Sequence, residues 1–221
     1  MNEPLRVWSA CTYPSTELGA QRGVFLQDTW HAEKFVKAIK GDDLKKGFAY
    51  VPVPIGGPCR RLNNGNKDEA CAWFGEMIAK KFRITAPGLL LVPVPPHDGT
   101  DSGVVRKSRI WAIAEAVAEQ NRACVATVGI TWRNPMQSAR RGGTRSLTTL
   151  LQNCVAADSI RPGASILLVD DVITTGHHLA ACATRLRKVG ANVLLGICVG
   201  RTVTEQESEP FSWIERSVEL V

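Results

Sequence analysis

The chain has 221 residues, 44% of them hydrophobic, and a formal net charge of +6. That length fits one α/β domain of ordinary size with an appended segment, and the charge favours anionic partners without naming them. The seven cysteines show no CxxC and no paired spacing, which argues against a zinc module and a disulfide framework.

The opening segment, MNEPLRVWSACTYP, lacks the basic start and apolar core of a secretory signal. No apolar run in the chain approaches the ~18 residues that a membrane span needs. We therefore expect a cytoplasmic protein with no membrane partner.

The amino-terminal part of the chain is predicted to hold a helix, a strand and a flexible connection. Apolar side chains recur with helical spacing over residues 32–39, after Asp28 and Thr29 as candidate caps. Residues 48–54 predict a strand, and the two prolines in it favour a sheet edge. Residues 55–68 are rich in turn formers, which is typical of a flexible connection.

A helix and a core strand are predicted next. Asp68 is a candidate cap for a helix with apolar side chains on one face, and residues 89–94 form the continuous apolar run of a buried strand. The loop PPHDGTDSG then leads into a second amphipathic helix. Glycines and small polar residues before a helix present backbone N–H groups to an anion, although an ordinary capped loop has the same composition.

Residues 123–131 predict another strand, and a basic, glycine-containing segment follows it. Three arginines flank two glycines there, and such a segment favours mobility because glycine resists ordering and charges favour water. A short helix is predicted at its far end. The arginines are Arg140, Arg141 and Arg145. A solvent loop without a catalytic task is the alternative.

The most informative stretch is ILLVDDVITTGHH, residues 166–178. Residues 166–169 are typical of a strand buried on both faces of a parallel sheet. Asp170 and Asp171 are then expected at its carboxyl end, where open α/β sheets place their ligands. Apolar residues at helical spacing follow, and Gly190 is the expected helix stop.

The loop of residues 172–176 is therefore predicted to lie between a strand end and a helix start. Free backbone N–H groups and the helix dipole favour an anion there, the hydroxyls of Thr174 and Thr175 add donors, and Gly176 permits close approach. Adjacent carboxylates would repel a phosphate unless they served sugar hydroxyls or a bound cation. A phosphorylated ribose meets both conditions. The alternative is that the aspartates only cap the strand and helix.

DDVITTG, residues 170–176, resembles the motif that binds 5-phosphoribosyl 1-diphosphate in type I phosphoribosyltransferases. With LLLVPVP at 89–95 and RNPMQSARRGGTRS at 133–146, the order of motifs is similar to that of the ComF/GntX group. Two features depart from that pattern. His178 stands where Thr or Ser is usual, and the amino-terminal four-cysteine zinc module of many ComF proteins is lacking.

The resemblance implies an α/β fold with a central parallel sheet flanked by helices. Residues 68–200 would form the core, and residues 1–67 and 201–221 a hood, meaning a variable part outside the core that holds the acceptor. The 5-phosphate would be bound by Val172, Ile173, Thr174, Thr175, Gly176, His177 and His178. The pyrophosphate loop would contain Pro96, His97, Asp98 and Gly99. Candidate stacking groups for the acceptor are Trp8, Trp30 and Trp213.

The implied activity is transfer of the phosphoribosyl group to a small nitrogenous acceptor with release of pyrophosphate. Asp170 and Asp171 would hold the ribose hydroxyls, directly or through water on Mg²⁺, and the three arginines would face pyrophosphate. Two alternatives stay open: a non-catalytic ComF-like protein in DNA uptake or regulation, and a site for another phosphate ligand. Nucleic acid is not favoured, because the basic residues are spread widely. The sequence identifies neither the acceptor nor the oligomeric state.

Overall fold

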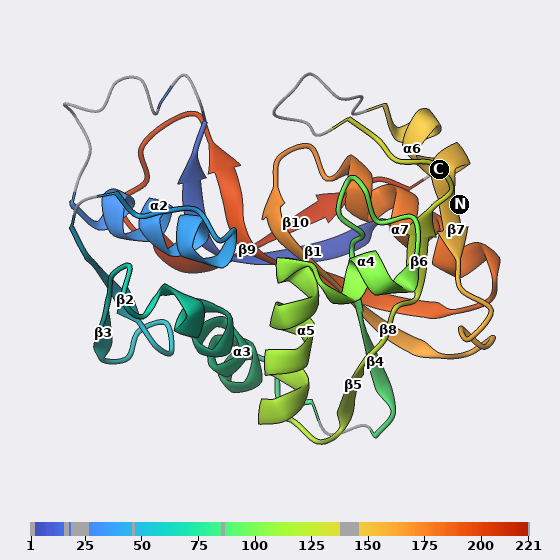
Figure 1. Cartoon of the computed structure of the whole chain (residues 1–221), viewed down its shortest axis with the longest axis horizontal. Helices are drawn as coiled ribbons and strands as arrows, with labels where there is room; N and C mark the ends of the chain where they lie inside the picture. Colours follow the sequence, from blue (N-terminus) through green and yellow to red (C-terminus); the bar gives the residue numbers. More distant parts are fainter. Residues whose placement is uncertain are drawn as a thin grey trace.

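The structure, a computed structural model, describes residues 3–15, 18, 27–45, 47–84, 87–137 and 146–220. Its centre is a six-stranded sheet with the strand order β10-β1-β9-β8-β4-β5 (Figure 1). All neighbouring strands are parallel except β10, which is antiparallel to β1. The strands are β1 (Leu5–Pro14), β4 (Leu89–Pro93), β5 (Cys124–Ala126), β8 (Ser165–Ile173), β9 (Asn192–Val203) and β10 (Phe211–Val218).

Helices cover both faces of this sheet, so the predicted α/β class is confirmed. On one face α2 (Gln27–Ile39), α3 (Ala70–Lys81) and α5 (Arg109–Gln120) share a core with Leu167 and Val169 of β8. On the other, α6 (Leu147–Asn153) and α7 (His177–Lys188) share a core with Ile166 and Leu168. Successive side chains of a strand point to opposite faces, so β8 is buried on both sides, as its apolar run predicts.

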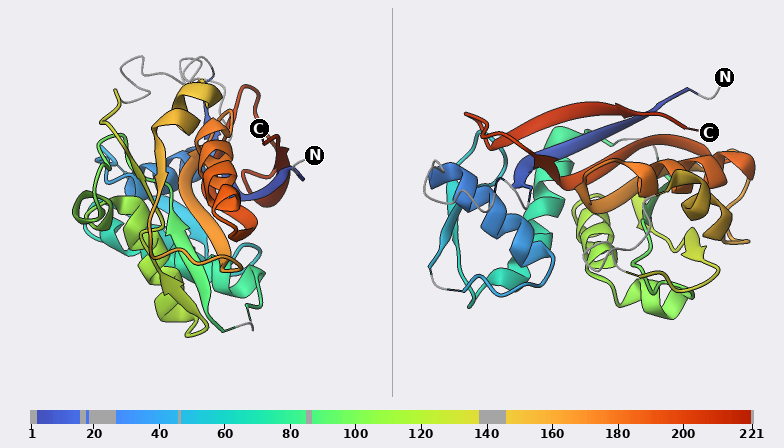
Figure 2. Two further views of the ribbon diagram at one scale, coloured as in Figure 1. Left: turned by 90° about the vertical axis from the view of Figure 1, so that its right-hand side faces the viewer. Right: turned by 90° about the horizontal axis from the view of Figure 1, so that it is seen from above.

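Both terminal segments contribute strands to the central sheet. β1 lies between β9 and β10, with Val7 opposite Gly196 and Leu5 opposite Val218, and Figure 2 shows β1 and β10 running alongside each other. These two strands belong to the segments 1–67 and 201–221 that are expected to form the hood, and the division of the chain into core and hood stays a prediction. Their pairing partners are distant in sequence, which a local pattern does not reveal. The boundaries themselves stay predictions.

The predicted flexible connection over residues 55–68 is wrong at β3 (Cys59–Leu62). This strand pairs antiparallel with β2 (Ala49–Pro52), which confirms the strand expected within residues 48–54. The sequence of β3, CRRL, has only one buried residue, Leu62, so it lacks the alternation that marks a strand. Asp68 lies in a single 3₁₀ turn, η2 (Lys67–Glu69), and forms an ion pair with Arg109 at 3.3 Å without capping α3.

The single strand predicted over residues 123–131 is two strands. β5 ends at Ala126, after which β6 (Ile130–Trp132) pairs antiparallel with β7 (Cys154–Ala156) in a separate two-stranded sheet. A short helix, α4 (Ser102–Arg106), also precedes α5. The described helices include none that is long and apolar enough to cross a membrane.

Candidate functional site

The DDVITTG segment continues the central strand further than its apolar run predicts. β8 extends to Ile173, because β9 is long enough to supply partners beyond Asp170: Val172 lies opposite Gly200 and Ile173 opposite Arg201. Only residues 174–176 separate the strand from α7. The backbones of Val172 and Ile173 therefore belong to the sheet, and the predicted loop of residues 172–176 is shorter by two residues. Their predicted role in phosphate binding stays a prediction.

Asp170 and Asp171 have unequal surroundings. Asp170 is 9% exposed, whereas the Asp171 side chain is 32% exposed. Asp170 Oδ1 accepts the backbone N–H of Asp171 at 2.8 Å, and Asp171 Oδ1 accepts the N–H of Val172 at 2.6 Å. Both carboxylates are thus held by backbone donors, and Asp171 is the one more open to a ligand.

Burial raises the pKa of the Asp170 carboxyl well above its ordinary value, and the adjacent charge of Asp171 raises it further. The N–H of Asp171 and the ammonium of Lys40 lower the pKa and oppose that rise only in part. Burial also raises the pKa of the Cys182 and Cys198 thiols, and the charge of Asp170 raises both further. A cation or a hydrogen-bond donor from a ligand would relieve the crowding of negative charge at this pair.

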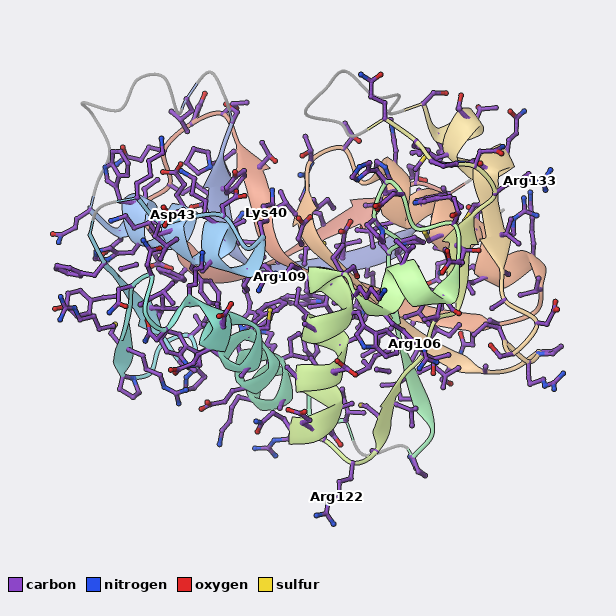
Figure 3. The ribbon with its side chains drawn as sticks, in the orientation of Figure 1. Lys40, Asp43, Arg106, Arg109, Arg122 and Arg133 are labelled. Carbon is purple, nitrogen blue, oxygen red and sulfur yellow. The ribbon has the colours of Figure 1, made fainter. Side chains whose placement is uncertain are left out.

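Lys40 brings a cation to the carboxylate pair, and nothing in its local sequence predicts this. It follows α2, and its Nζ lies 3.9 Å from Asp171 Oδ2 and 4.4 Å from the ring centroid of Tyr13. Figure 3 shows Lys40 near the middle of the molecule, whereas Arg122 and Arg133 lie at its periphery. A lysine at the carboxyl end of a helix is common, because its positive charge interacts favourably with the helix dipole. Only the folded structure therefore shows that Lys40 contacts the site.

The chain enters α7 through Gly176, whose φ is 82°. A Cβ at this position would meet Val218 Cγ2 at 2.8 Å, so both the backbone conformation and the neighbouring β10 strand require glycine. Gly176 is the N-cap of α7 and has no side chain to accept from the first helical turn. We call residues 174–178 the cradle. Within the cradle, the N–H group of His177 donates to Thr175 Oγ1 at 3.5 Å. The predicted strand, glycine turn and helix are all present, in the predicted order.

The loop after β4, predicted to bind pyrophosphate, makes many bonds of its own. The N–H of Gly99 donates to the Pro96 carbonyl and that of Thr100 to the Asp98 carbonyl, both at 2.8 Å. Asp101 caps α4 by accepting from the N–H groups of residues 103 and 104. His97 and Asp98 are exposed, with Nδ1 and Oδ1 3.9 Å apart. The capped-loop alternative describes the backbone well, and pyrophosphate binding stays a prediction.

Trp132 joins this loop to the start of α7, and the sequence reasoning missed it. Its side chain is buried, and its indole N–H donates to the carbonyls of Pro95 at 3.2 Å and Pro96 at 2.8 Å. Its ring also meets the His178 ring edge-on, with the centroids 6.0 Å apart. His178, which replaces the usual hydroxyl residue, thus packs against the residue that anchors the neighbouring loop.

Some of the predicted residues lie elsewhere. Arg140, Arg141 and Arg145 fall outside the described residues, while the helix expected after them is confirmed as α6. Trp213 stacks on Phe74 with ring centroids 6.3 Å apart, and Trp8 meets Phe82 at 6.1 Å. These two half-buried tryptophans pack against other aromatic residues of the protein itself.

The carboxylate oxygens of Asp170 and Asp171 are ligands of the kind that magnesium prefers. Among the described residues, no group of three or more His, Cys, Asp or Glu side chains is placed to hold a metal ion. Magnesium does not need such a cage, since it prefers oxygen ligands, keeps several waters and is commonly held by one or two carboxylates together with substrate phosphates. Asp171 and the buried Asp170 supply such oxygens beside the cradle.

No protein-family model matches the chain. Over 40 residues it is 50% identical to the adenine phosphoribosyltransferase of Gluconacetobacter diazotrophicus and 48% identical to that of Gluconobacter oxydans. Each match covers 18% of this chain and 23% or 22% of the relative, so the chain spans less than a quarter of the length of these curated relatives.

Solved structures that are similar to the chain include two further adenine phosphoribosyltransferases. That of Thermoanaerobacter pseudethanolicus is 14% identical, with a TM-score of 0.41 over 70% of this chain and 83% of the other. That of Trypanosoma brucei, in complex with AMP, pyrophosphate and ribose-5-phosphate, is 12% identical, with a TM-score of 0.42 over 84% and 85%.

Proposed function

We propose that this chain binds 5-phosphoribosyl 1-diphosphate with Mg²⁺ and transfers the phosphoribosyl group to a small nitrogenous acceptor. The observation that carries the proposal is the placement of Asp170 and Asp171 on a buried parallel strand, directly before the glycine-capped start of α7. The local likeness to adenine phosphoribosyltransferases supports it and makes adenine the first acceptor to test.

In this proposal the ligand lies at the carboxyl end of β8, and different groups of the protein bind its 5-phosphate and its ribose. The 5-phosphate accepts from the N–H groups and hydroxyls of the cradle, whose helix end favours an anion. Asp171 accepts from a ribose hydroxyl, and Lys40, whose Nζ lies 3.9 Å from the Asp171 carboxylate, helps to hold that side chain in place. Asp170 acts through the backbone of Asp171, whose N–H it accepts, and is a positioning residue.

The transfer balances without any further reactant. A nitrogen lone pair of the acceptor forms a bond to the anomeric carbon, and the bond from that carbon to the diphosphate oxygen breaks. Pyrophosphate leaves with the electron pair, and the acceptor nitrogen gives up a proton to a carboxylate or to water. Bound magnesium supplies charge neutralisation on the diphosphate. Positioning and charge stabilisation by the chain are expected to contribute more than proton transfer.

Calorimetry with 5-phosphoribosyl 1-diphosphate and magnesium tests the donor site. We expect binding by the native chain and a loss of affinity of about 100-fold in Asp171→Asn, because this variant removes a ligand charge at the site. Asp158→Asn, a carboxylate on an exposed turn outside the site, is the matched control. No heat in the native protein, or equal heat in Asp171→Asn, would overturn the proposal.

One observation favours a second candidate, a protein that binds the donor without turnover. Asp170 is buried and accepts the N–H of Asp171, so Asp171 is the more open carboxylate for a divalent cation, and one open carboxylate holds such a cation less well than two. From the order of the three sequence motifs we also propose that the chain is related to the ComF/GntX group. A protein that binds the donor without turnover would be consistent with that relationship. Release of pyrophosphate with any of a panel of nitrogenous bases decides between the two candidates.

A further inference from the structure

A groove of about 600 Å³ opens at the carboxyl end of β9. Its walls come from the end of β9, the turn that follows and β10, and it also includes Thr174, the first residue after β8. Small-molecule sites commonly have volumes of about 300–1,000 Å³ and occur at the carboxyl ends of parallel strands. The groove is thus large enough for a heterocyclic ring and lies at the sheet edge where a ligand is expected.

Thr174 belongs both to this groove and to the cradle. Its hydroxyl forms a 2.8 Å hydrogen bond with that of Thr202 on β9, and its carbonyl accepts from Arg216 Nη1 at 3.5 Å. Thr202 and Arg216 both line the groove. A molecule in the groove and a phosphate on the cradle would therefore share a wall, so the two sites are continuous.

The cation at the base of the groove is already paired. Arg201 is 4% exposed, and its guanidinium forms an ion pair with Glu207 and donates to the carbonyl and the hydroxyl of Ser212, each at 3.3 Å. Glu205 adds a second carboxylate to the lining, and Arg216 a second cation. To reach Arg201, an incoming carboxylate would have to displace Glu207 from a buried partner and face Glu205 as well, whereas an ion pair with the exposed Arg216 would contribute little.

We propose that this groove holds the acceptor, and that it selects an uncharged nitrogen heterocycle over the same ring bearing a carboxylate. The ring edge would exchange hydrogen bonds with the Thr202 hydroxyl and the acidic side chains, and Ile214, 40% exposed, supplies an apolar wall. This inference rests on the proposed function, because it takes the cradle to hold the donor phosphate.

Matched ring pairs test the selection. Uracil and orotate differ by one carboxylate, as do nicotinamide and nicotinate, and adenine is a further neutral ring. Calorimetry with ribose 5-phosphate present, to fill the cradle without turnover, should show binding of at least one neutral ring. Its acidic counterpart should bind about tenfold more weakly. An acidic ring that binds as tightly as its neutral counterpart overturns the proposal, and so does a protein that binds the donor but no ring.

Glu207→Gln sharpens the test, because it leaves the charge of Arg201 without its carboxylate partner. The affinity for the acidic ring should rise about tenfold and that for the neutral ring should change little. Glu209→Gln, on the same turn but outside the groove lining, is the matched control and should change neither. Equal behaviour of the two variants contradicts the inference.

A second variant covers the case in which Glu207→Gln does not fold. Ile214→Ser keeps the buried ion pair and removes apolar contact, so neutral-ring affinity should fall about fivefold. An unchanged affinity would place the ring elsewhere. Donor binding is measured in every variant: its absence from the native protein rejects the proposed function, whereas its presence with unaffected ring binding rejects only the groove.

Discussion

Two loops begin at the carboxyl ends of strands in the central sheet, one after β4 and one after β8. Their backbone N–H groups differ in the acceptors to which they donate. After β4, the N–H groups of Gly99 and Thr100 donate within the loop, and Asp101 accepts from the first turn of α4. After β8, the chain passes through Gly176 into α7; this N-cap has no side chain, and the N–H of His177 donates to Thr175 Oγ1 over the longer distance of 3.5 Å.

Both loops lie at the carboxyl ends of parallel strands, so the acceptors of their N–H groups distinguish them as candidate anion sites. An N–H group with a close protein acceptor offers less to a ligand than one whose protein acceptor is at the limit of hydrogen-bond distance. We therefore expect the loop after β8 to bind phosphate more strongly than the loop after β4. The loop after β4 is also tied to Trp132 by the indole N–H, and pyrophosphate binding there stays a prediction.

The largest expected effect is at Gly176. Gly176→Ala places a Cβ 2.8 Å from Val218 Cγ2 in addition to imposing a strained φ, so the free energy of unfolding should fall by about 3 kcal/mol. Gly163 has a similar φ of 79°, but a Cβ there would meet nothing within 4 Å, so Gly163→Ala should cost only about 1 kcal/mol. Equal losses in urea unfolding would show that the contact with β10 is unimportant.

The next effect concerns pH. Because the folded chain holds the proton of Asp170 more tightly than the unfolded chain, the stability from this group is fully present below pH 3.8 and is lost as the pH rises toward the raised folded pKa. The loss is at most about 1.4 kcal/mol per pH unit. Asp170→Asn should remove this slope, so it should be more stable than the native chain at pH 8. Parallel stability curves of the two proteins from pH 4 to 8 would contradict the assignment.

Trp132→Phe tests the support of the loop after β4. Losing the indole N–H leaves two carbonyls without this donor and should cost about 1–2 kcal/mol. Hydrogen exchange of the amides of residues 97–100 should accelerate. Trp73→Phe, a buried tryptophan in α3, is the control for the change in volume and should leave those amides unchanged. Unaltered exchange in Trp132→Phe would mean that the loop after β4 stays folded without the hydrogen bonds of the indole.

The smallest expected effect is at the α4 cap. Asp101→Ala removes the acceptor of two N–H groups and should cost about 1 kcal/mol in thermal unfolding. Asp98→Ala, on the exposed part of the same loop, should stay within about 0.5 kcal/mol of the native chain. If Asp101→Ala strengthened phosphate binding at this loop, the two loops would differ only by that cap.

Local patterns predicted those parts of the molecule that neighbours in sequence determine. The apolar run of residues 166–169 and the helical repeat after it predicted β8 and α7, and Gly176 has the positive φ that its place in the motif favours. β3 was missed, because its four residues carry no alternation. The end of β8 was missed, because its last pairs depend on the length of β9.

The candidate site could be predicted only where it is contiguous in the chain. Asp170, Asp171 and the cradle follow one another, and the motif shows them together. Lys40 and Trp132 come from other elements, and each is an ordinary residue in its local setting. The unequal burial of the two aspartates also depends on long-range packing, so the sequence presents them as equivalent when the structure does not.

The place of β1 has a consequence for how the chain reaches its native state. During synthesis residues 5–14 emerge well before their two neighbours in the sheet, residues 192–203 and 211–218. Such distant pairing slows folding, since a long loop must close before the contacts form. Until then β1 is an apolar strand with two open edges, which is a template for aggregation. A nascent chain of this protein would therefore need β9 and β10, or a chaperone, to protect β1.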